Sequence, residues 1–366
     1  MRSSEIRKRC EERRASELEA LIKYRASGGK VAGYTCHIFP SAVAAGLGLW
    51  PLRLLCGSSV DAESAGEKIV RPDICPHVKS LLGNVAEQRG MHAMVDLWIG
   101  LYTCDQMRRG MDSLSQRLGK EVHPVQLPAT RTVEAADYYA DQINRLVSDI
   151  SIRYKISYNQ EAATQWQKDR AAAGEVLSQA ARSGGLSPLD LHFLFHLFFI
   201  SRPAGLAQFL KDTINSGHKV KPKRTILLAG SPLTLEDTVL LEIMEERGIS
   251  VLPLNCTGLN TVETAGRMEK GNNSIRALAL SSFYGPACIR ARPNTEVYDR
   301  IRETLEASSA SGLIVKCLKF CDLWYTEKER MKKAFNIPVL FFDSDYASGG
   351  RERLTTRLDA FLEMLP

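Results

Sequence analysis

Residues 94–128 read MVDLWIGLYTCDQMRRGMDSLSQRLGKEVHPVQLP, and their pattern indicates the fold class. Its first part, residues 94–104, is a mostly apolar run with aromatic and β-branched side chains, which favours a buried strand. The following residues have a helical period that stops at Gly119, and residues 121–128 form a further strand-like segment. The order strand, helix, strand predicts a mostly parallel sheet in an α/β fold.

The sequence before this stretch extends the same alternation toward the N-terminus. Lys30 to Cys36 and Pro51 to Leu55 are candidate strands, and Ser41 to Leu49 is a candidate helix between them. Ser4 to Tyr24 spaces its apolar residues at helical intervals among charges, which predicts an amphipathic leading helix. We therefore expect an N-terminal α/β domain over residues 1–131.

The second half repeats the alternation after a long interval without strand signals. Residues 132–220 have long amphipathic patterns, which predict a helical connector. Residues 221–366 then form a second α/β domain, with candidate strands at 223–230, 249–255, 312–320 and 337–343 and a closing helix at 355–365. Ser231 and Pro232 suit the N-cap and first turn of a helix that ends at Gly248. The expected fold is two Rossmann-like or flavodoxin-like domains with mostly parallel sheets.

Length and composition are those of a two-domain globular protein. The 366 residues exceed one ordinary core, and the hydrophobic content of 44% and charged content of 25% are ordinary. No segment has the apolar length of a signal peptide or a membrane span, so we expect a cytoplasmic protein with no membrane association. The net charge of +6 is mild and no basic stripe with interleaved aromatics is present, so no nucleic-acid partner is expected.

Six of the nine cysteines fall into two sets of three, one set in each half of the chain: Cys36, Cys75 and Cys104, then Cys256, Cys288 and Cys321. The first and last members of each set directly follow strand-like runs, where an open α/β sheet presents ligands to a bound group. A reducing compartment and an odd total argue against a disulfide framework. Converging cysteines indicate a thiolate-held metal centre, and buried free thiols are the alternative. No ferredoxin, radical or zinc-ribbon spacing is present.

Other candidate side chains have simpler structural interpretations. His192 and His196 are one helical turn apart, but the surrounding LDLHFLFHLFF predicts a buried helix, so a core role is favoured over metal binding. Asp343 and Asp345 at the end of a strand could act as acid or base, although capping or a solvated loop is favoured. Two thiols outside both sets are interpreted as structural: Cys10 and Cys56.

The segments around the cysteines resemble a known family, the 2-hydroxyacyl-CoA dehydratase subunits and benzoyl-CoA reductases. The resemblance covers most of the chain, and its motifs are specific when taken together although each is short. They are GYTCHIFP (33–40), RPDICPHVKS (71–80), GLYTCDQMRRGM (100–111), ILLAGSPL (226–233), LNCTGLNTVE (254–263), KFCD (319–322) and IPVLFFDSDYASGGRERLTTRLDAFLEML (337–365).

The resemblance also implies a cofactor. In the dehydratases and reductases three cysteines of each subunit hold a [4Fe-4S] cluster, and these match Cys75, Cys104 and Cys321 by motif. A sister branch, the double-cubane cluster proteins, is more similar to this chain because it has further cysteines that match Cys36, Cys256 and Cys288. In that branch all six would hold one double-cubane [8Fe-9S] cluster, three from each domain. The surroundings of Cys288, FYGPACIRARP, depart from the family pattern.

The family further implies low-potential electron transfer as the function. A separate ATP-hydrolysing iron-sulfur activator would deliver single electrons to the cluster, and in the double-cubane branch the protein would then reduce a small molecule. The alternative is a 2-hydroxyacyl-CoA dehydratase or benzoyl-CoA reductase subunit, with one four-iron cluster, that acts on a CoA thioester. A third hypothesis is a non-catalytic electron carrier. The family also implies a homodimer, or a heterodimer with a related subunit.

Overall fold

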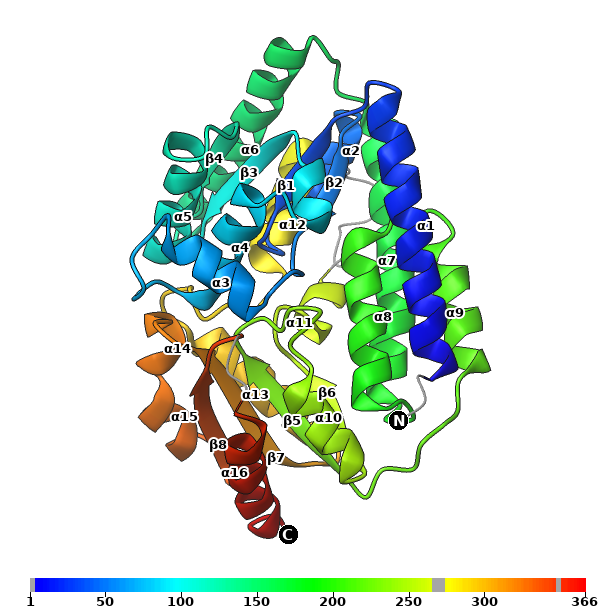
Figure 1. Ribbon diagram of the computed structural model, residues 1–366, viewed down its shortest axis with the longest axis vertical. Coiled ribbons are helices and arrows are strands. Elements are labelled where there is room, and N and C mark those ends of the chain that lie inside the picture. The colour runs from blue at the N-terminus through cyan, green and yellow to red at the C-terminus, as the bar shows by residue number, and fades with distance from the viewer. Residues whose placement is uncertain (1–3, 265–273, 347–349) are drawn as a thin grey trace.

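Two parallel sheets organise the chain, and helices cover both of them (Figure 1). The computed structural model describes residues 4–264, 274–346 and 350–366. The N-terminal sheet has the strand order β2-β1-β3-β4, with β1 (Val31–Tyr34), β2 (Trp50–Arg53), β3 (Leu97–Tyr102) and β4 (Val122–Gln126). The C-terminal sheet has the order β6-β5-β7-β8, with β5 (Arg224–Gly230), β6 (Ile249–Pro253), β7 (Ala310–Leu318) and β8 (Val339–Ser344). The predicted α/β fold is confirmed. Within each half the strands, counted along the chain, lie in the same order in the sheet: second, first, third, fourth.

Helices connect the strands and build a separate helical layer. In the N-terminal half they are α2 (Ser41–Gly46), α3 (Val60–Glu67), α4 (Pro76–Ala86), the 3-10 helix η1 (Gly90–Met94) and α5 (Asp105–Gln116). The long helices are α1 (Glu5–Ala26), α6 (Val133–Tyr154), α7 (Gln160–Arg182), α8 (Pro188–Ile200) and α9 (Leu206–Ser216). The C-terminal half adds α10 (Val239–Glu246), α11 (Leu259–Val262), α12 (Ile275–Tyr284), α13 (Thr295–Glu306), α14 (Asp322–Tyr325), α15 (Lys328–Lys333) and α16 (Arg351–Glu363).

The long helices begin where the sequence supplies capping side chains. The hydroxyl of Ser4 accepts a hydrogen bond from the Arg7 N–H at the start of α1, 3.1 Å away. Thr132, Asn159 and Ser187 accept equivalent bonds at the starts of α6, α7 and α8. Each cap satisfies a backbone donor that has no partner inside the helix, so these boundaries follow from local chemistry.

The predicted helix start at Ser231 and Pro232 is wrong, because α10 begins only at Val239. The Ser231 N–H donates to the Lys316 carbonyl at 2.7 Å, and its hydroxyl accepts from the Leu318 N–H at 3.0 Å. Ser231 therefore joins the end of β5 to the end of β7 instead of capping a helix. A serine side chain bonds whichever N–H the tertiary structure brings near, and local sequence does not specify that choice.

The hydrophobic core shows how the two halves are joined. One face of the N-terminal sheet packs against α2, α6 and α12, and the rings of Tyr139 and Phe283 stack with centroids 5.5 Å apart. Helix α12 therefore lies on the N-terminal sheet although it follows β6 in the chain. Helices α1 and α7 both pack against α8 and α9, and these four helices form the helical layer on the right of Figure 1.

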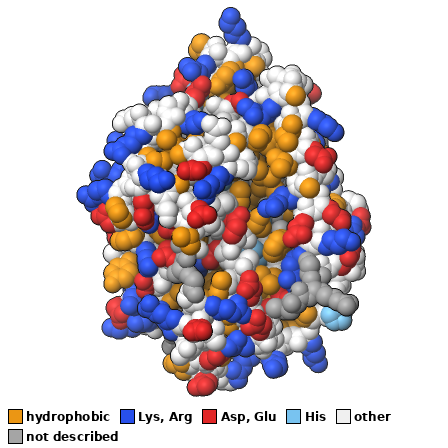
Figure 2. All heavy atoms as spheres, viewed as in Figure 1, with side chains coloured by type: hydrophobic (Ala, Val, Ile, Leu, Met, Phe, Trp, Pro, Cys, Tyr) orange, Lys and Arg blue, Asp and Glu red, His pale blue; other side chains and the backbone are white. Residues whose placement is uncertain are grey.

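The surface is charged with both signs. On the face drawn in Figure 2, Lys and Arg side chains are interspersed with Asp and Glu side chains. Among the described residues, no helix combines the length and the apolar character needed to cross a membrane.

Candidate metal centre

One cavity of about 190 Å³ collects all six cysteines of the two predicted sets. We call it the cysteine cavity; its cysteines are Cys36, Cys75, Cys104, Cys256, Cys288 and Cys321. Parallel strands present their carboxyl ends at one edge of a sheet, and segments that follow β1, β3, β6 and β7 bring four of these thiols to the cavity. Residues far apart in the chain therefore converge from both halves of the molecule.

Cys36 and Cys104 lie at the switch point of the N-terminal sheet. β1 and β3 are neighbours there, and the chain continues from them to strands on opposite sides, β2 and β4. Segments after two such strands diverge, which opens a crevice at the carboxyl edge. In the C-terminal sheet the switch point lies between β5 and β7, whereas Cys256 follows the edge strand β6. The two cysteine sets are therefore not equivalent by topology.

Two of the N-terminal cysteines occupy helix starts. Cys104 is the N-cap of α5, and its Sγ accepts a hydrogen bond from the Met107 N–H at 3.4 Å. Cys75 is the N-cap of α4, where Pro76 occupies the first turn, and its own N–H donates to Gln106 Oε1 at 3.0 Å. The partial positive charge of a helix N-terminus stabilises a thiolate, so these positions favour metal ligation.

On the C-terminal side the backbone of the cysteine segments is held by side chains. The Cys256 carbonyl accepts hydrogen bonds from Arg53 Nη2 at 3.0 Å and from Thr261 Oγ1 at 2.5 Å. Cys321 is the N-cap of α14, and the preceding Phe320 has a φ of +61°. A non-glycine residue in this left-handed region is uncommon and costs conformational energy, so the turn that presents Cys321 is held by its surroundings.

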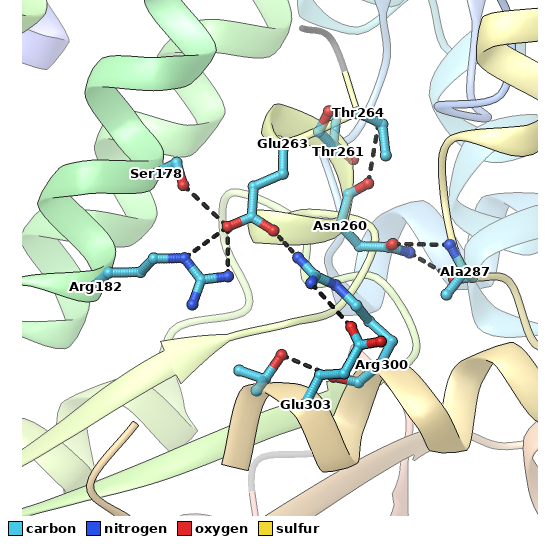
Figure 3. A network of polar contacts seen from close by, with 10 residues as sticks. Ser178, Arg182, Asn260, Thr261, Glu263, Thr264, Ala287, Arg300 and Glu303 are labelled. Carbon is cyan, nitrogen blue, oxygen red and sulfur yellow. Dashed lines mark hydrogen bonds and ion pairs between the residues drawn. The ribbon is translucent and has the colours of Figure 1, made fainter. Parts of the chain in front are cut away.

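A polar network joins the wall of the cysteine cavity to the helical layer (Figure 3). Glu263, just after α11, accepts hydrogen bonds from Ser178 and Arg182 of α7, at 2.9 Å and 2.7 Å, and pairs with Arg300 of α13. Asn260 of α11 exchanges two hydrogen bonds with the backbone of Ala287, at 2.7 Å and 3.1 Å. Asn260, Ala287 and Arg300 all line the cavity, so this network positions the segment that carries Cys288.

Buried arginines give the cysteine cavity positive charge. Arg53 is 1% exposed and Arg290 is 5% exposed, and both line the cavity. Nε and Nη2 of Arg290 have no hydrogen-bond partner in the described part of the chain, and neither guanidinium forms an ion pair with a described carboxylate. A buried charge without a counter-ion is costly, so these two cations fit an anionic occupant of the cavity.

Most of the cavity thiols are held in their neutral form. Burial raises the pKa of Cys36 and of Cys75 to about 12, raises that of Cys256 to about 11, and raises that of Cys104 as well. Cys321 differs from these four thiols, because a hydrogen bond with the Cys317 thiol lowers its pKa. A thiol with a raised pKa loses its proton only when a cation such as a metal stabilises the thiolate.

The donors that converge on the cysteine cavity are thiols from both halves of the chain. Within residues 4–264, 274–346 and 350–366, no group of three or more His, Cys, Asp or Glu side chains is arranged to hold a metal ion. An iron-sulfur cluster bonds different thiolates to different irons, so its ligands lie further apart than those of one zinc ion. Six thiols around one cavity, with buried cations beside them, are donors of the type that such a cluster would use.

Comparison with known proteins agrees with the resemblance seen in the sequence. Residues 36–365 match the family described as 2-hydroxyglutaryl-CoA dehydratase, D-component. The chain belongs to this family. It is also similar to "Putative dehydratase subunit YjiM" of Escherichia coli (strain K12), with 22% identity over 374 residues that cover 97% of this chain and 96% of that protein. A family match over most of the chain supports a role as a dehydratase-type component.

The other predicted candidates lie away from the cysteine cavity. His192 and His196 are buried in α8, where their ring centroids are 4.4 Å apart and His192 Nε2 contacts the Leu235 carbonyl at 3.1 Å. Asp345 forms an ion pair with Lys319 at 2.7 Å, and Asp343 is exposed. None of these four side chains lines the cavity. Residues 347–349 of the C-terminal family motif lie outside the described residues.

The arginines of the site could not be predicted from the sequence. Arg53 is the last residue of β2, Arg290 follows Cys288 closely in the chain, and Arg300 lies in α13. Arginine is mostly a surface residue, so an isolated arginine in a sequence does not indicate burial. The local feature that could have indicated a buried arginine is the position of Arg53 at the end of β2, a fully buried strand.

Proposed function

We propose that this protein is the cluster-bearing component of a 2-hydroxyacyl-CoA dehydratase-type enzyme. The observation that carries the proposal is the convergence of six cysteines from both halves on one cavity. Cys75, Cys104 and Cys321 would be the thiolate ligands of an iron-sulfur cluster. When bound, such a cluster stores and transfers single electrons at low potential. An ATP-hydrolysing activator would supply the electrons, and a CoA thioester would be the substrate.

The residues of this chain would hold the cluster and tune its properties. Cys75 and Cys104 lie at the N-termini of α4 and α5, where the helix dipoles would stabilise their thiolates. Gln106 accepts a hydrogen bond from the Cys75 N–H and so orients the Cys75 backbone. Arg53 and Arg290 would balance the negative charge of the thiolates and the cluster. Burial, net charge and hydrogen bonds to sulfur are the means by which a protein sets a cluster potential.

A double-cubane cluster that reduces a small molecule is a second candidate function. The observation that favours it is the presence of Cys36, Cys256 and Cys288 in the same cavity as the other three thiols. Two adjoining cubanes would use all six cysteines, whereas one four-iron cluster leaves three of them unused.

Iron and acid-labile sulfide counts on anaerobically purified protein test both candidates. We expect about four irons per chain for a single cluster and about eight for a double cubane. Cys75→Ser should lose the cluster in either case. Cys36→Ser should halve or abolish the iron of a double cubane and leave the iron of a single cluster unchanged.

The matched control is Cys56→Ser, which removes a thiol outside the cysteine cavity and should keep the full iron content. Protein that takes up no iron or sulfide after anaerobic reconstitution would overturn the proposal. With the cluster in place, turnover is measured with an ATP-dependent activator and either CoA thioesters or small reducible molecules. Consistent inactivity would leave a non-catalytic electron carrier as the function.

A further inference from the structure

A second cavity of about 480 Å³ lies beside the cysteine cavity, and the proposed function does not use it. It is enclosed by α1, by α8, by the segment that follows β2 and by η1. Arg53 and Leu55 line both cavities, so these two side chains form a shared wall. The volume is within the usual range for a small-molecule site.

The interior of the second cavity is mainly apolar. Leu18 of α1 faces it together with Leu197, Phe199 and Ile200 of α8, and Leu55 closes the side toward the cysteine cavity. On the face drawn in Figure 2, hydrophobic side chains gather between the α1 edge and the half that contains the N-terminal sheet. Such a lining favours a ligand with an apolar body.

One buried polar atom in the lining, a ring nitrogen of His196, has no hydrogen-bond partner among the described residues. His196 is 5% exposed, and its Nε2 makes no hydrogen bond within the described residues. Burial lowers the pKa of His196 well below its usual range, so the ring is neutral. An unsatisfied nitrogen in a buried side chain is unfavourable in the absence of a ligand or water.

The charges around the second cavity favour an anion. Arg14 lines it from α1, is exposed, and forms no ion pair or hydrogen bond with a described side chain. Arg89 lines it next to η1 and also pairs with Glu87 at 3.7 Å, and Arg53 lies in the shared wall. Glu11 and Glu236 are the acidic lining residues, and Glu236 already accepts a hydrogen bond from the Ser58 N–H at 3.3 Å. The guanidinium groups therefore outnumber the carboxylates.

We propose that the second cavity binds a small organic carboxylate with an apolar body, with the body between α1 and α8 and the carboxylate at Arg14. This inference goes beyond the proposed function, because it concerns a site without any of the six cysteines. A carboxylate accepts charge-assisted hydrogen bonds from a guanidinium, which supplies the polar part of the recognition. The apolar body supplies the rest through burial against the α8 side chains.

Isothermal titration calorimetry of the full-length protein with hexanoate tests the proposal, with hexan-1-ol as the uncharged probe. We expect saturable binding of one hexanoate per chain and weaker binding of the alcohol. Arg14→Gln should weaken hexanoate about fivefold and leave hexan-1-ol unchanged. Lys8→Gln, which removes an exposed charge from the same helix outside the cavity, is its control.

A second variant blocks the cavity without disturbing the core. Ala15 is an exposed residue of α1 that lines the cavity, so Ala15→Trp should weaken both probes at least about tenfold. Ser16→Trp is the matched control, because Ser16 is exposed on the same helix and does not line the cavity.

The two proposals fail in different ways. Cys75→Ser should lose iron and still bind hexanoate, and Ala15→Trp should lose hexanoate binding and keep its iron. Hexanoate binding that is absent up to about 1 mM, or that is unaffected by Ala15→Trp, would overturn the assignment of this cavity.

Discussion

At the residue scale, Arg53 joins the two halves of the molecule. It ends β2 of the N-terminal sheet, donates to the Thr35 carbonyl at 3.0 Å, and donates to the Cys256 carbonyl at 3.0 Å. Its guanidinium also lies 4.6 Å from the centre of the Phe199 ring in α8. One side chain therefore contacts a strand end, a cysteine segment and the helical layer.

We expect Arg53→Met to lower the free energy of unfolding by about 2–4 kcal/mol, because the Thr35 and Cys256 carbonyls each lose a hydrogen bond from the buried guanidinium. Urea denaturation followed by circular dichroism measures the change. Arg145→Met, on the exposed side of α6, is the control and should stay within about 0.5 kcal/mol of the unchanged protein. Equal changes in the free energy of unfolding for the two variants would show that the buried contacts of Arg53 do not stabilise the fold.

A second residue-scale prediction concerns pH. Burial lowers the pKa of His192 to about 4 in the folded protein, whereas a histidine in the unfolded chain titrates near about 6.5. Between these values the unfolded state binds more protons, so the free energy of unfolding falls as the pH decreases from about 6.5 to about 4. Through His192 alone the free energy of unfolding falls by about 3 kcal/mol when the pH reaches about 4.

His192→Gln should therefore reduce the pH dependence of stability, measured by urea denaturation between pH 6.5 and pH 5, where carboxylates of ordinary pKa titrate little. His218→Gln is the control because His218 is exposed. An unchanged slope in His192→Gln would contradict the assignment of a neutral buried imidazole.

At the scale of elements, α3 and α4 pack so closely that two glycines are required. A Cβ built on Gly83 of α4 would lie 2.0 Å from the Ala62 carbonyl, and one on Gly66 of α3 would lie 2.1 Å from the Lys79 carbonyl. These contacts involve backbone atoms, which cannot move without shifting a helix. The close packing fixes the direction of α4, whose first turn presents Cys75.

Gly83→Ala should lower the free energy of unfolding by about 2–4 kcal/mol, although alanine is favoured over glycine in a helix by about 1 kcal/mol. Chemical denaturation measures stability, and iron content reports the position of Cys75. Ala86→Gly, at the exposed end of α4, isolates the helix-propensity effect and should cost no more than about 1 kcal/mol. A stabilising effect of Gly83→Ala would exclude the close contact.

Elements also differ in how well the sequence predicts them. The apolar run before Cys104 forms β3, and the helical spacing of apolar residues after Cys104 forms α5. Both can be predicted because each pattern depends only on which face of that one element is buried. The helix start predicted at Ser231 is wrong because the hydrogen-bond partners of Ser231, Lys316 and Leu318, lie far away in the chain. Hydrogen bonds to distant residues leave no local pattern.

At the scale of the whole molecule, Glu263 links the helical layer to the C-terminal half. It contacts Ser178 and Arg182 of α7 and Arg300 of α13, and its side chain is 12% exposed (Figure 3). The pairing is better shielded from water than a surface ion pair, so loss of one partner leaves buried charge behind.

We expect Glu263→Gln to lower the free energy of unfolding by about 1–3 kcal/mol. Glu303→Gln is the control, because Glu303 contacts Arg300 at 3.5 Å with a side chain that is 66% exposed, and its loss should cost less than about 0.5 kcal/mol. Thermal and urea denaturation measure both variants. If the two substitutions have equal effects, the network does not stabilise the contact between the halves.

The α/β alternation, the long amphipathic helices and the family motifs around the cysteines can be predicted from the sequence, because periodicity and short motifs are properties of neighbouring residues. Three features emerge only from the three-dimensional fold: Cys36 and Cys104 lie at a switch point, α12 packs on the N-terminal sheet, and Arg53 and Arg290 line the cysteine cavity. These features depend on strand order and on contacts between distant segments. A one-dimensional pattern does not encode them, because burial depends on which surfaces meet.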